Sequence, residues 1–162
     1  MPSATRARAL ERAPIVLMLG MLLGISGILA ALGLLAPSMG IGGMEAGRIG
    51  LAAVFLFTGI GHFVRTREMA EMLPPNVPAR IPIIQATGIF ELALAAALVA
   101  PATARAAGLA AMAFLIAVFP ANVSAAGRRV NFGGHGVGPP YLAARLPLQL
   151  LLIAWAYWFA VR

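Results

Sequence analysis

The sequence contains no cysteine among its 162 residues. A chain without thiols cannot by itself relay electrons between thiols and disulfides, hold an iron–sulfur cluster through thiolates or form a disulfide bond. Its two histidines, His62 and His135, lie on an expected helix and in an expected loop, which excludes a haem held between two helical histidines. No element carries metal-ligand spacing, so we expect no metal site. Any redox role must therefore involve a bound molecule such as a quinone, or a partner protein.

Charge is scarce as well. Charged residues make up 10% of the chain, whereas an ordinary soluble domain has about a quarter. Hydrophobic residues make up 61%, and the mean hydropathy is +0.92, which predicts an integral membrane protein. Lysine and aspartate are absent while Ala, Gly, Pro and Arg are abundant, a bias typical of GC-rich bacteria. We therefore expect a location in the bacterial inner membrane.

The hydrophobic residues gather in runs that approach or reach the roughly 20 residues needed to cross a hydrocarbon core as a helix. These unbroken runs lack period-2 alternation, so they predict helices and not a barrel. A basic arm at residues 1–13 precedes the first run, which is too long for a cleaved signal peptide and predicts a retained helix. We expect one transmembrane domain at residues 14–162, with spans at 14–36, 47–64, 82–100, 105–121 and 146–161, and with Tyr141 as an alternative start for the last.

The arginines orient these five expected spans. Nine of the 12 basic residues fall on the side of the N-terminus, against Arg48, Arg105 and Arg162 on the other. Short loops rich in arginine face the cytoplasm, so we expect a cytoplasmic N-terminus and an outer C-terminus. The arginines form no continuous groove with interleaved aromatics, so we expect the lipid bilayer and no nucleic acid as partner. The nine are Arg6, Arg8, Arg12, Arg65, Arg67, Arg80, Arg128, Arg129 and Arg145.

Polar residues within the spans are the candidates for a functional site. A charge at the centre of a spanning helix costs roughly 2.5–3.5 kcal/mol on insertion scales, so Glu91 requires compensation. The expected topology brings the polar side chains of four helices to the cytoplasmic half of the membrane. The candidate polar cluster consists of His62, Gln85, Thr87, Glu91, Asn122, Arg145 and Gln149.

The spacing along the helices separates two of these residues. At about 1.5 Å per residue, Glu91 lies roughly 14 Å above Pro82, and His62 lies about 4–5 Å above Arg65. The resulting axial gap of roughly 9 Å is too long to assert a direct hydrogen bond between His62 and Glu91. Glu91 is then either protonated or linked through water to the other polar groups. Two interpretations stay open for the cluster: a site for a polar ligand, quinone or proton, and interhelical hydrogen bonding without further function.

Three shorter sequence patterns concern helix packing, a possible repeat and one connection. Gly20 and Gly24, like Ala104 and Gly108, are four residues apart, which predicts close approach of helices in lipid. The tripeptide TGI occurs at 58–60 and 87–89, so that His62 and Glu91 follow it at matching offsets, although three residues do not establish a repeat. Residues 65–78 are open to two interpretations, a short interfacial helix ended by prolines or a solvated connection.

Five segments taken together resemble the DoxX-like membrane proteins. They are FLFTGIGHF at 55–63, MLPPNVP at 72–78, TGIFELALA at 87–95, AVFPANV at 117–123 and RLPLQLLLIAWAYW at 145–158. The resemblance covers residues 50–160 and implies a four-helix transmembrane core. The fold class that we predict is therefore an all-α membrane protein, with a four-helix bundle core plus an additional N-terminal transmembrane helix.

The family takes its name from the small subunit of a thiosulfate:quinone oxidoreductase. The resemblance therefore implies an accessory or anchor subunit of a quinone-linked redox system, without independent catalysis and with a soluble or membrane oxidoreductase subunit as partner. It attaches no established catalytic role to His62, Glu91, Asn122, Arg145 or Gln149. The alternative is a stand-alone binder, transporter or enzyme for a small lipid-soluble molecule. No cofactor is evident, quinone is the candidate, and the oligomeric state is open.

Overall fold

The structure, a computed structural model, describes residues 4–132, 135–136 and 138–162. Five of its helices are long and apolar enough to cross a membrane. The chain is therefore an all-α, multi-pass membrane protein, as the sequence predicts. In chain order the elements are α1 (Ala4–Leu35), the 3-10 helix η1 (Pro37–Met39), α2 (Gly43–Val64), α3 (Thr66–Met72), α4 (Arg80–Val99), α5 (Ala104–Arg128), β1 (Asn131–Phe132), β2 (His135–Gly136), α6 (Pro139–Ala156) and the π-helix η2 (Tyr157–Val161).

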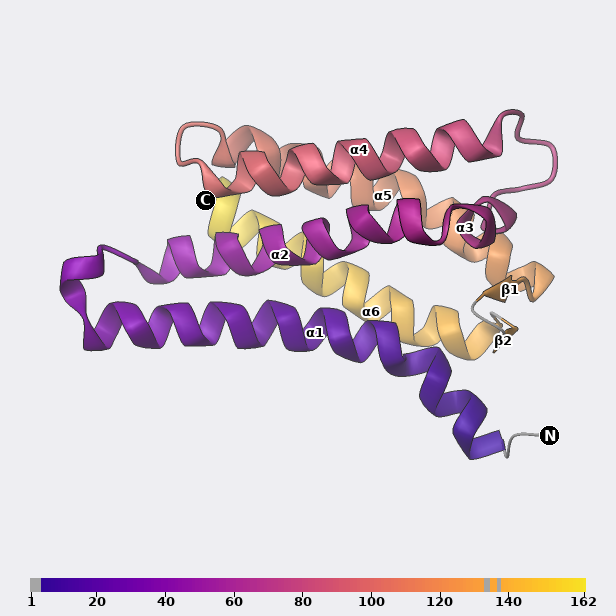
Figure 1. Cartoon of the computed structure of the whole chain (residues 1–162), viewed down its shortest axis with the longest axis horizontal. Coiled ribbons are helices and arrows are strands. Elements are labelled where there is room, and N and C mark those ends of the chain that lie inside the picture. The colour runs from indigo at the N-terminus through magenta and orange to yellow at the C-terminus, as the bar shows by residue number, and fades with distance from the viewer. Residues whose placement is uncertain (1–3, 133–134, 137) are drawn as a thin grey trace.

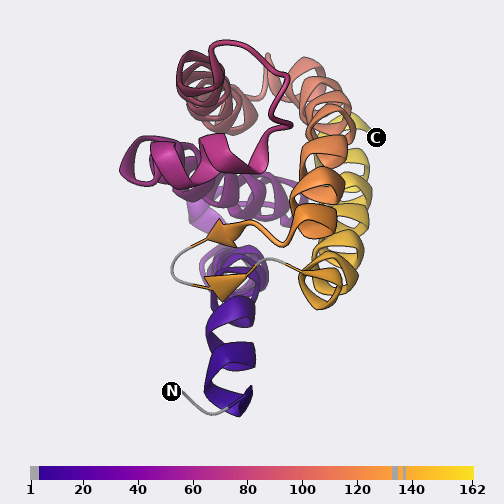
Figure 2. The same cartoon turned by 90° about the vertical axis from the view of Figure 1, so that its right-hand side faces the viewer.

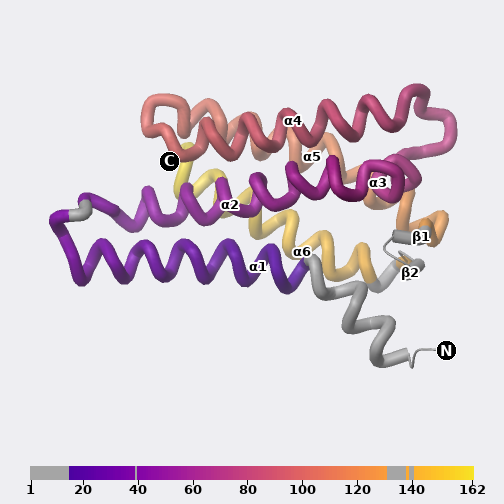
Figure 3. Tube along the Cα trace, viewed as in Figure 1, coloured from indigo at the N-terminus to yellow at the C-terminus, as the bar shows by residue number. Residues whose placement is uncertain are grey.

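The five long helices lie side by side along the long axis of the molecule (Figures 1 and 3). Successive connections lie at alternate ends. The α2–α4 connection, which contains α3, and the short β1–β2 ladder lie at one end, while η1, the α4–α5 turn and the C-terminus lie at the other (Figure 1). Each long helix therefore traverses the whole length of the bundle, which is the arrangement that five membrane crossings require.

The helix bounds follow the predicted spans most closely where local signals are strong. Helix α4 covers Arg80–Val99, against the predicted 82–100. Helix α5 continues to Arg128, beyond the predicted end at 121. Pro120 removes only one backbone donor, and the burial of Asn122, Ala125 and Ala126 stabilises the continued helix. Helix α6 begins at Pro139, since proline is tolerated in a first turn, and the apolar span starts at the alternative position Tyr141.

Helix α1 is part of the bundle core. Met18 is 4% exposed and Leu22 is fully buried, and both belong to the same hydrophobic cluster as Leu51 and Leu98. The predicted additional N-terminal helix is thus present, and it packs against α2 and α6. Its helical structure also extends back to Ala4, through most of the segment predicted as a basic arm.

Helices α2 and α4 approach each other at two glycines. A Cβ atom placed on Gly88 would lie 2.6 Å from the Cβ of His62, and one on Gly59 would lie 2.9 Å from a methyl carbon of Leu92. A side chain at either position would push the two helices apart. The predicted close approach at Gly20 and Gly24 is wrong, because a Cβ at either would meet nothing within 4 Å.

Candidate functional site

His62 lies near the end of α2 with its imidazole turned toward α4. Its Nδ1 lies 2.9 Å from the carbonyl oxygen of Ile84 and 3.0 Å from Oγ1 of Thr87. Thr87 donates its own hydroxyl proton to the same Ile84 carbonyl at 2.9 Å. A carbonyl oxygen only accepts, so these contacts fit Nδ1 as the protonated donor. The other ring nitrogen, Nε2, is then left for the opposite side of the ring.

Nε2 of His62 faces the carboxyl of Glu91, one turn beyond Thr87 on α4. The distance from Nε2 to Oε2 of Glu91 is 3.7 Å, which is too long for a hydrogen bond. Glu91 is only 7% exposed, and its Oε2 has no hydrogen-bond partner among the described residues. A buried carboxylate oxygen without a hydrogen-bond donor from the protein is costly, since burial removes its solvation.

The roughly 9 Å axial gap expected between His62 and Glu91 is wrong, because His62 lies level with Gly88, which precedes Glu91 by three residues or about 4.5 Å of helix. That gap follows from placing Arg65 and Pro82 at one level. In the structure, α4 begins beyond the level at which α2 ends, because α3 and the following loop carry the chain further out before it returns (Figure 1). The close α2–α4 approach at Gly59 and Gly88 then brings the side chains of the two helices together.

Two further side chains act on the Glu91 carboxyl. The Thr58 hydroxyl lies beside it and donates to the Val54 carbonyl oxygen at 3.0 Å. Arg145 on α6 is near enough to interact with Glu91 electrostatically, although its guanidinium donates through Nη1 to Sδ of Met18 on α1, at 3.6 Å. The His62–Glu91 pair thus combines a fixed imidazole nitrogen with an acidic oxygen, and a proton placed between them can reside on either group.

Among the described residues, none of the remaining candidates is hydrogen-bonded to this pair. Gln149 is buried and donates through Nε2 to the Leu115 carbonyl oxygen at 2.8 Å, which links α6 to α5. Asn122 is buried and reaches the Val118 carbonyl within its own helix at 3.5 Å. Gln85 is exposed at the surface of α4. The structure therefore brings together His62, Thr87 and Glu91 from the predicted cluster, with Arg145 nearby.

The candidate set omits the residues that make this contact possible, namely Thr58, Gly59 and Gly88. Gly59 and Gly88 are the central residues of the two TGI tripeptides, and the contact between α2 and α4 forms at these glycines. The repeated tripeptide is thus the sequence signal that could have located the site. Among the described residues, no group of three or more His, Cys, Asp or Glu side chains could hold a metal ion.

Residues 51–160 match a family model described as "Domain of unknown function (DUF8561)". The matched range begins within α2 and ends in η2, so it contains both partners of the His62–Glu91 pair. It nearly coincides with residues 50–160, over which the chain resembles the DoxX-like proteins. The family's description names no activity, ligand or partner. No curated protein and no solved structure matches the chain.

Proposed function

The chain belongs to the family described as a domain of unknown function (DUF8561), and we propose that it binds a small lipid-soluble molecule at the His62–Glu91 pair. One observation carries the proposal: Oε2 of Glu91 is buried without a hydrogen-bond partner among the described residues, 3.7 Å from a histidine nitrogen. Ionisable groups inside a membrane are costly and are typically retained for function.

The geometry suits a ligand that carries oxygen atoms. A ligand hydroxyl beside the two groups can donate a hydrogen bond to Nε2 of His62 or to Oε2 of Glu91, and a ligand carbonyl oxygen can accept one from whichever of the two groups carries a proton. Thr58, His62 and Thr87 are half-buried, and Phe63, next to His62 on α2, exposes 44% of its surface. The pair therefore lies close to the lipid-facing surface of the bundle, from which a hydrophobic molecule can enter.

A quinone is the ligand class that we propose, because it is lipid-soluble and takes up protons at its oxygens when it is reduced. The DoxX resemblance supports the same assignment, since it implies an accessory subunit of a quinone-linked redox system. In this proposal an oxidoreductase subunit supplies the electrons, because the chain has no cysteine. The protein acts in a bacterial inner membrane with its N-terminus in the cytoplasm, as the arginine distribution favours.

Binding of short-chain ubiquinone and menaquinone analogues to the purified protein tests this function. Calorimetry should detect binding to the wild type, and Glu91→Gln should weaken it at least about tenfold, because hydrogen bonds to charged groups contribute about 1.5–3 kcal/mol. The thermal stability of Glu91→Gln in detergent should match the wild type. Gln85→Leu is the matched control, since Gln85 is exposed on the same helix and should leave binding unchanged.

Two results would contradict the proposal. Equal affinity of Glu91→Gln and the wild type would show that the carboxyl is not part of the binding site. A wild-type protein that binds no quinone, yet consistently co-purifies with a soluble oxidoreductase, would instead identify a non-binding membrane anchor.

A further inference from the structure

Arg145 is a charged residue of α6 that reaches the interior of the bundle. Its Nη1 donates to Sδ of Met18 on α1 at 3.6 Å, and Met18 is only 4% exposed. Gln149, one turn further along α6, is buried as well. Seen from the α3 end, α4 and α6 lie on different sides of the bundle (Figure 2). The Arg145 side chain therefore extends inward from a different side of the bundle than Glu91 on α4.

Contacts between α1 and α2 show at which level of the bundle Met18 lies. A Cβ atom on Gly50 of α2 would meet Oγ of Ser26 on α1, so these two residues are level. Met18 precedes Ser26 by eight residues, or about 12 Å of helix. Thr58 follows Gly50 by the same number, and the two helices run in opposite directions (Figure 1). Met18 therefore lies at about the level of Thr58, whose hydroxyl is beside the Glu91 carboxyl.

The Arg145 guanidinium and the Glu91 carboxyl thus share one level of the bundle, and they interact electrostatically. They form no ion pair with each other, and Arg145 forms none with any other side chain that the structure describes. The thioether of Met18 is a weak acceptor, so its contact compensates little of a guanidinium charge inside a membrane. On the other side, Oε2 of Glu91 is buried without a hydrogen-bond partner among the described residues. A cation and an acidic oxygen at one level are therefore both left without a bonded partner.

The total charge of these groups is zero or positive. Arg145 always keeps its proton, whereas His62 and Glu91 can each gain or lose one. With Glu91 ionised and His62 neutral, the three charges sum to zero, and each proton that the pair takes up adds one positive charge. A ligand with one negative charge can therefore bind together with one proton on the pair and leave the membrane interior without net charge, which avoids the cost of a buried ion.

We propose that Arg145 makes this site selective for a quinone that carries a negatively charged ring oxygen, as an ionised ring hydroxyl does. The proposal rests on the ligand binding proposed for the His62–Glu91 pair, and it adds the charge of the ligand. Arg145 acts here as a specificity residue, because its positive charge stabilises the charged oxygen through the low dielectric of the bundle interior.

Calorimetric titration of the purified protein in detergent with two matched compounds tests this selectivity. One is a short-chain alkyl hydroxynaphthoquinone, whose ring hydroxyl is ionised at neutral pH, and the other is its methyl ether, which is neutral. The wild type should bind the ionised compound more tightly than the ether. Arg145→Gln should lower the affinity for the ionised compound at least about tenfold more than the affinity for the ether, because unit charges roughly 10 Å apart interact that strongly at an effective dielectric constant of about 20. Arg145→Lys keeps the charge and should retain most of the preference.

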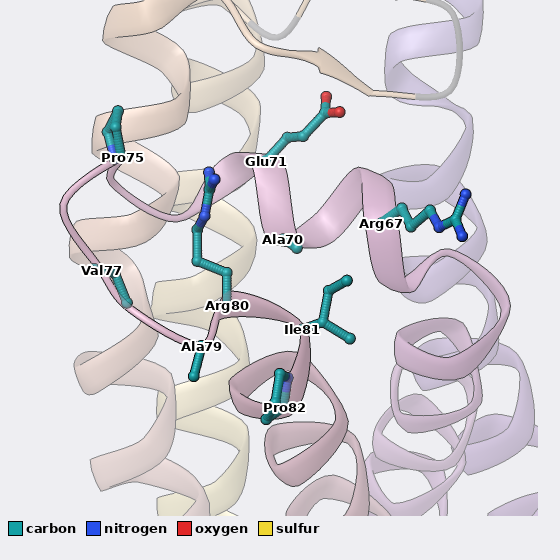
Figure 4. Close-up of a pocket in the computed structure, with 9 residues that line it drawn as sticks. All are labelled: Arg67, Ala70, Glu71, Pro75, Val77, Ala79, Arg80, Ile81 and Pro82. Carbon is teal, nitrogen blue, oxygen red and sulfur yellow. The ribbon is translucent and has the colours of Figure 1, made fainter.

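Arg67→Gln is the matched control. Arg67 is an exposed arginine of α3 at the same end of the bundle, and its side chain projects away from Arg80 and the start of α4 (Figure 4). This variant should keep the preference for the ionised compound. An equal loss of preference in Arg67→Gln would overturn the proposal, since it would show general attraction of an anion to a cationic protein.

Thermal unfolding in detergent checks that each variant is folded, and the wild-type comparison decides the selectivity even if Arg145→Gln does not fold. Equal binding of both compounds to the wild type, or an unchanged preference in folded Arg145→Gln, would overturn the role of Arg145 and leave the proposed binding function standing. Binding of neither compound to the wild type would instead overturn the binding function of the His62–Glu91 pair, and the selectivity with it.

Discussion

At the scale of single residues, the site depends on two backbone features and not only on its polar side chains. The Ile84 carbonyl oxygen accepts from both His62 and Thr87, which fixes the imidazole, and Gly88 allows His62 to lie against the α4 backbone. Leucine or alanine at position 88 would satisfy the hydropathy of the span equally well. The glycine is needed only because α2 lies against this position, so a substitution of Gly88 tests the α2–α4 geometry directly.

Gly88→Ala should destabilise the bundle. The new Cβ would lie 2.6 Å from Cβ of His62 and 3.0 Å from Cε2 of Phe63, so α2 and α4 must separate. Overpacking of this kind costs typically about 1–3 kcal/mol. Thermal unfolding in detergent should show a lower midpoint than the wild type, and quinone binding should weaken because the His62–Glu91 pair is pulled apart.

Gly24→Ala is the control for that substitution. A Cβ at Gly24 meets nothing within 4 Å, so the change adds helix propensity of about 0.5–1 kcal/mol without a clash. The unfolding midpoint should stay the same or rise. A similar loss of stability in both variants would mean that α2 and α4 do not cross as described.

At the scale of elements, α3 shows how a short helix is stabilised from outside itself. Seven residues form too short a helix to be stable alone in water, and Pro74 and Pro75 come just after its C-cap, Leu73. Arg128, which lies 55 to 57 residues further along the chain, supplies the bonds to its terminal carbonyls. Of the two interpretations of residues 65–78, the structure shows the short helix, at Thr66–Met72, and the residue that stabilises its end lies on α5.

Arg128→Gln should loosen α3. The substitution removes three hydrogen bonds that the guanidinium donates. A hydrogen bond to a charged group contributes about 1.5–3 kcal/mol. Since the chain has no cysteine, Ala70→Cys would supply a unique label at a buried position on α3. The rate of modification by a maleimide should rise at least about tenfold in Ala70→Cys/Arg128→Gln compared with Ala70→Cys alone.

The adjacent Arg129→Gln provides the matched control, because it removes a neighbouring charge and leaves the three carbonyl bonds in place. Its labelling rate should equal that of Ala70→Cys alone. If Arg128→Gln and Arg129→Gln accelerate labelling equally, the charge at this end of α5, and not the carbonyl bonds, holds α3.

At the scale of the whole molecule, the alternation of the connections determines the topology once one end is assigned. The structure places the α3 connection and the β1–β2 ladder at one end, with η1 and the C-terminus at the other. The arginine count then favours the α3 end as cytoplasmic, because nine of the 12 basic residues lie in the segments expected on that side.

Reporter fusions after Gly40, Asn76, Ala102, Gly134 and Arg162 test this topology. We expect them to report out, in, out, in and out, as five crossings with a cytoplasmic N-terminus require. A cytoplasmic signal at Arg162, with the other four as expected, would mean that α6 and η2 do not cross. A cytoplasmic signal at Gly40 would instead remove the α1 crossing.

The sequence alone determines the fold class and most of the helix bounds of this protein. Long apolar runs have no alternative in lipid except helices, since every backbone polar group must be bonded within its own segment. The proline and arginine signals between the runs are local as well, so they place the connections and favour an orientation. For the same reason the sequence singles out His62, Thr87 and Glu91, because polar residues within apolar spans are visible one by one.

Only the tertiary structure decides which of these polar residues meet. Helical spacing measures distance along one helix, but the relative level of two helices depends on the connection between them, here α3 and the loop to Arg80. The approach of α2 to α4 depends on Gly59 and Gly88 facing each other, whereas Gly20 and Gly24 have the same sequence character and face open space. The 3.7 Å contact between His62 and Glu91 is therefore a property of the packed pair of helices, which neither helix determines on its own.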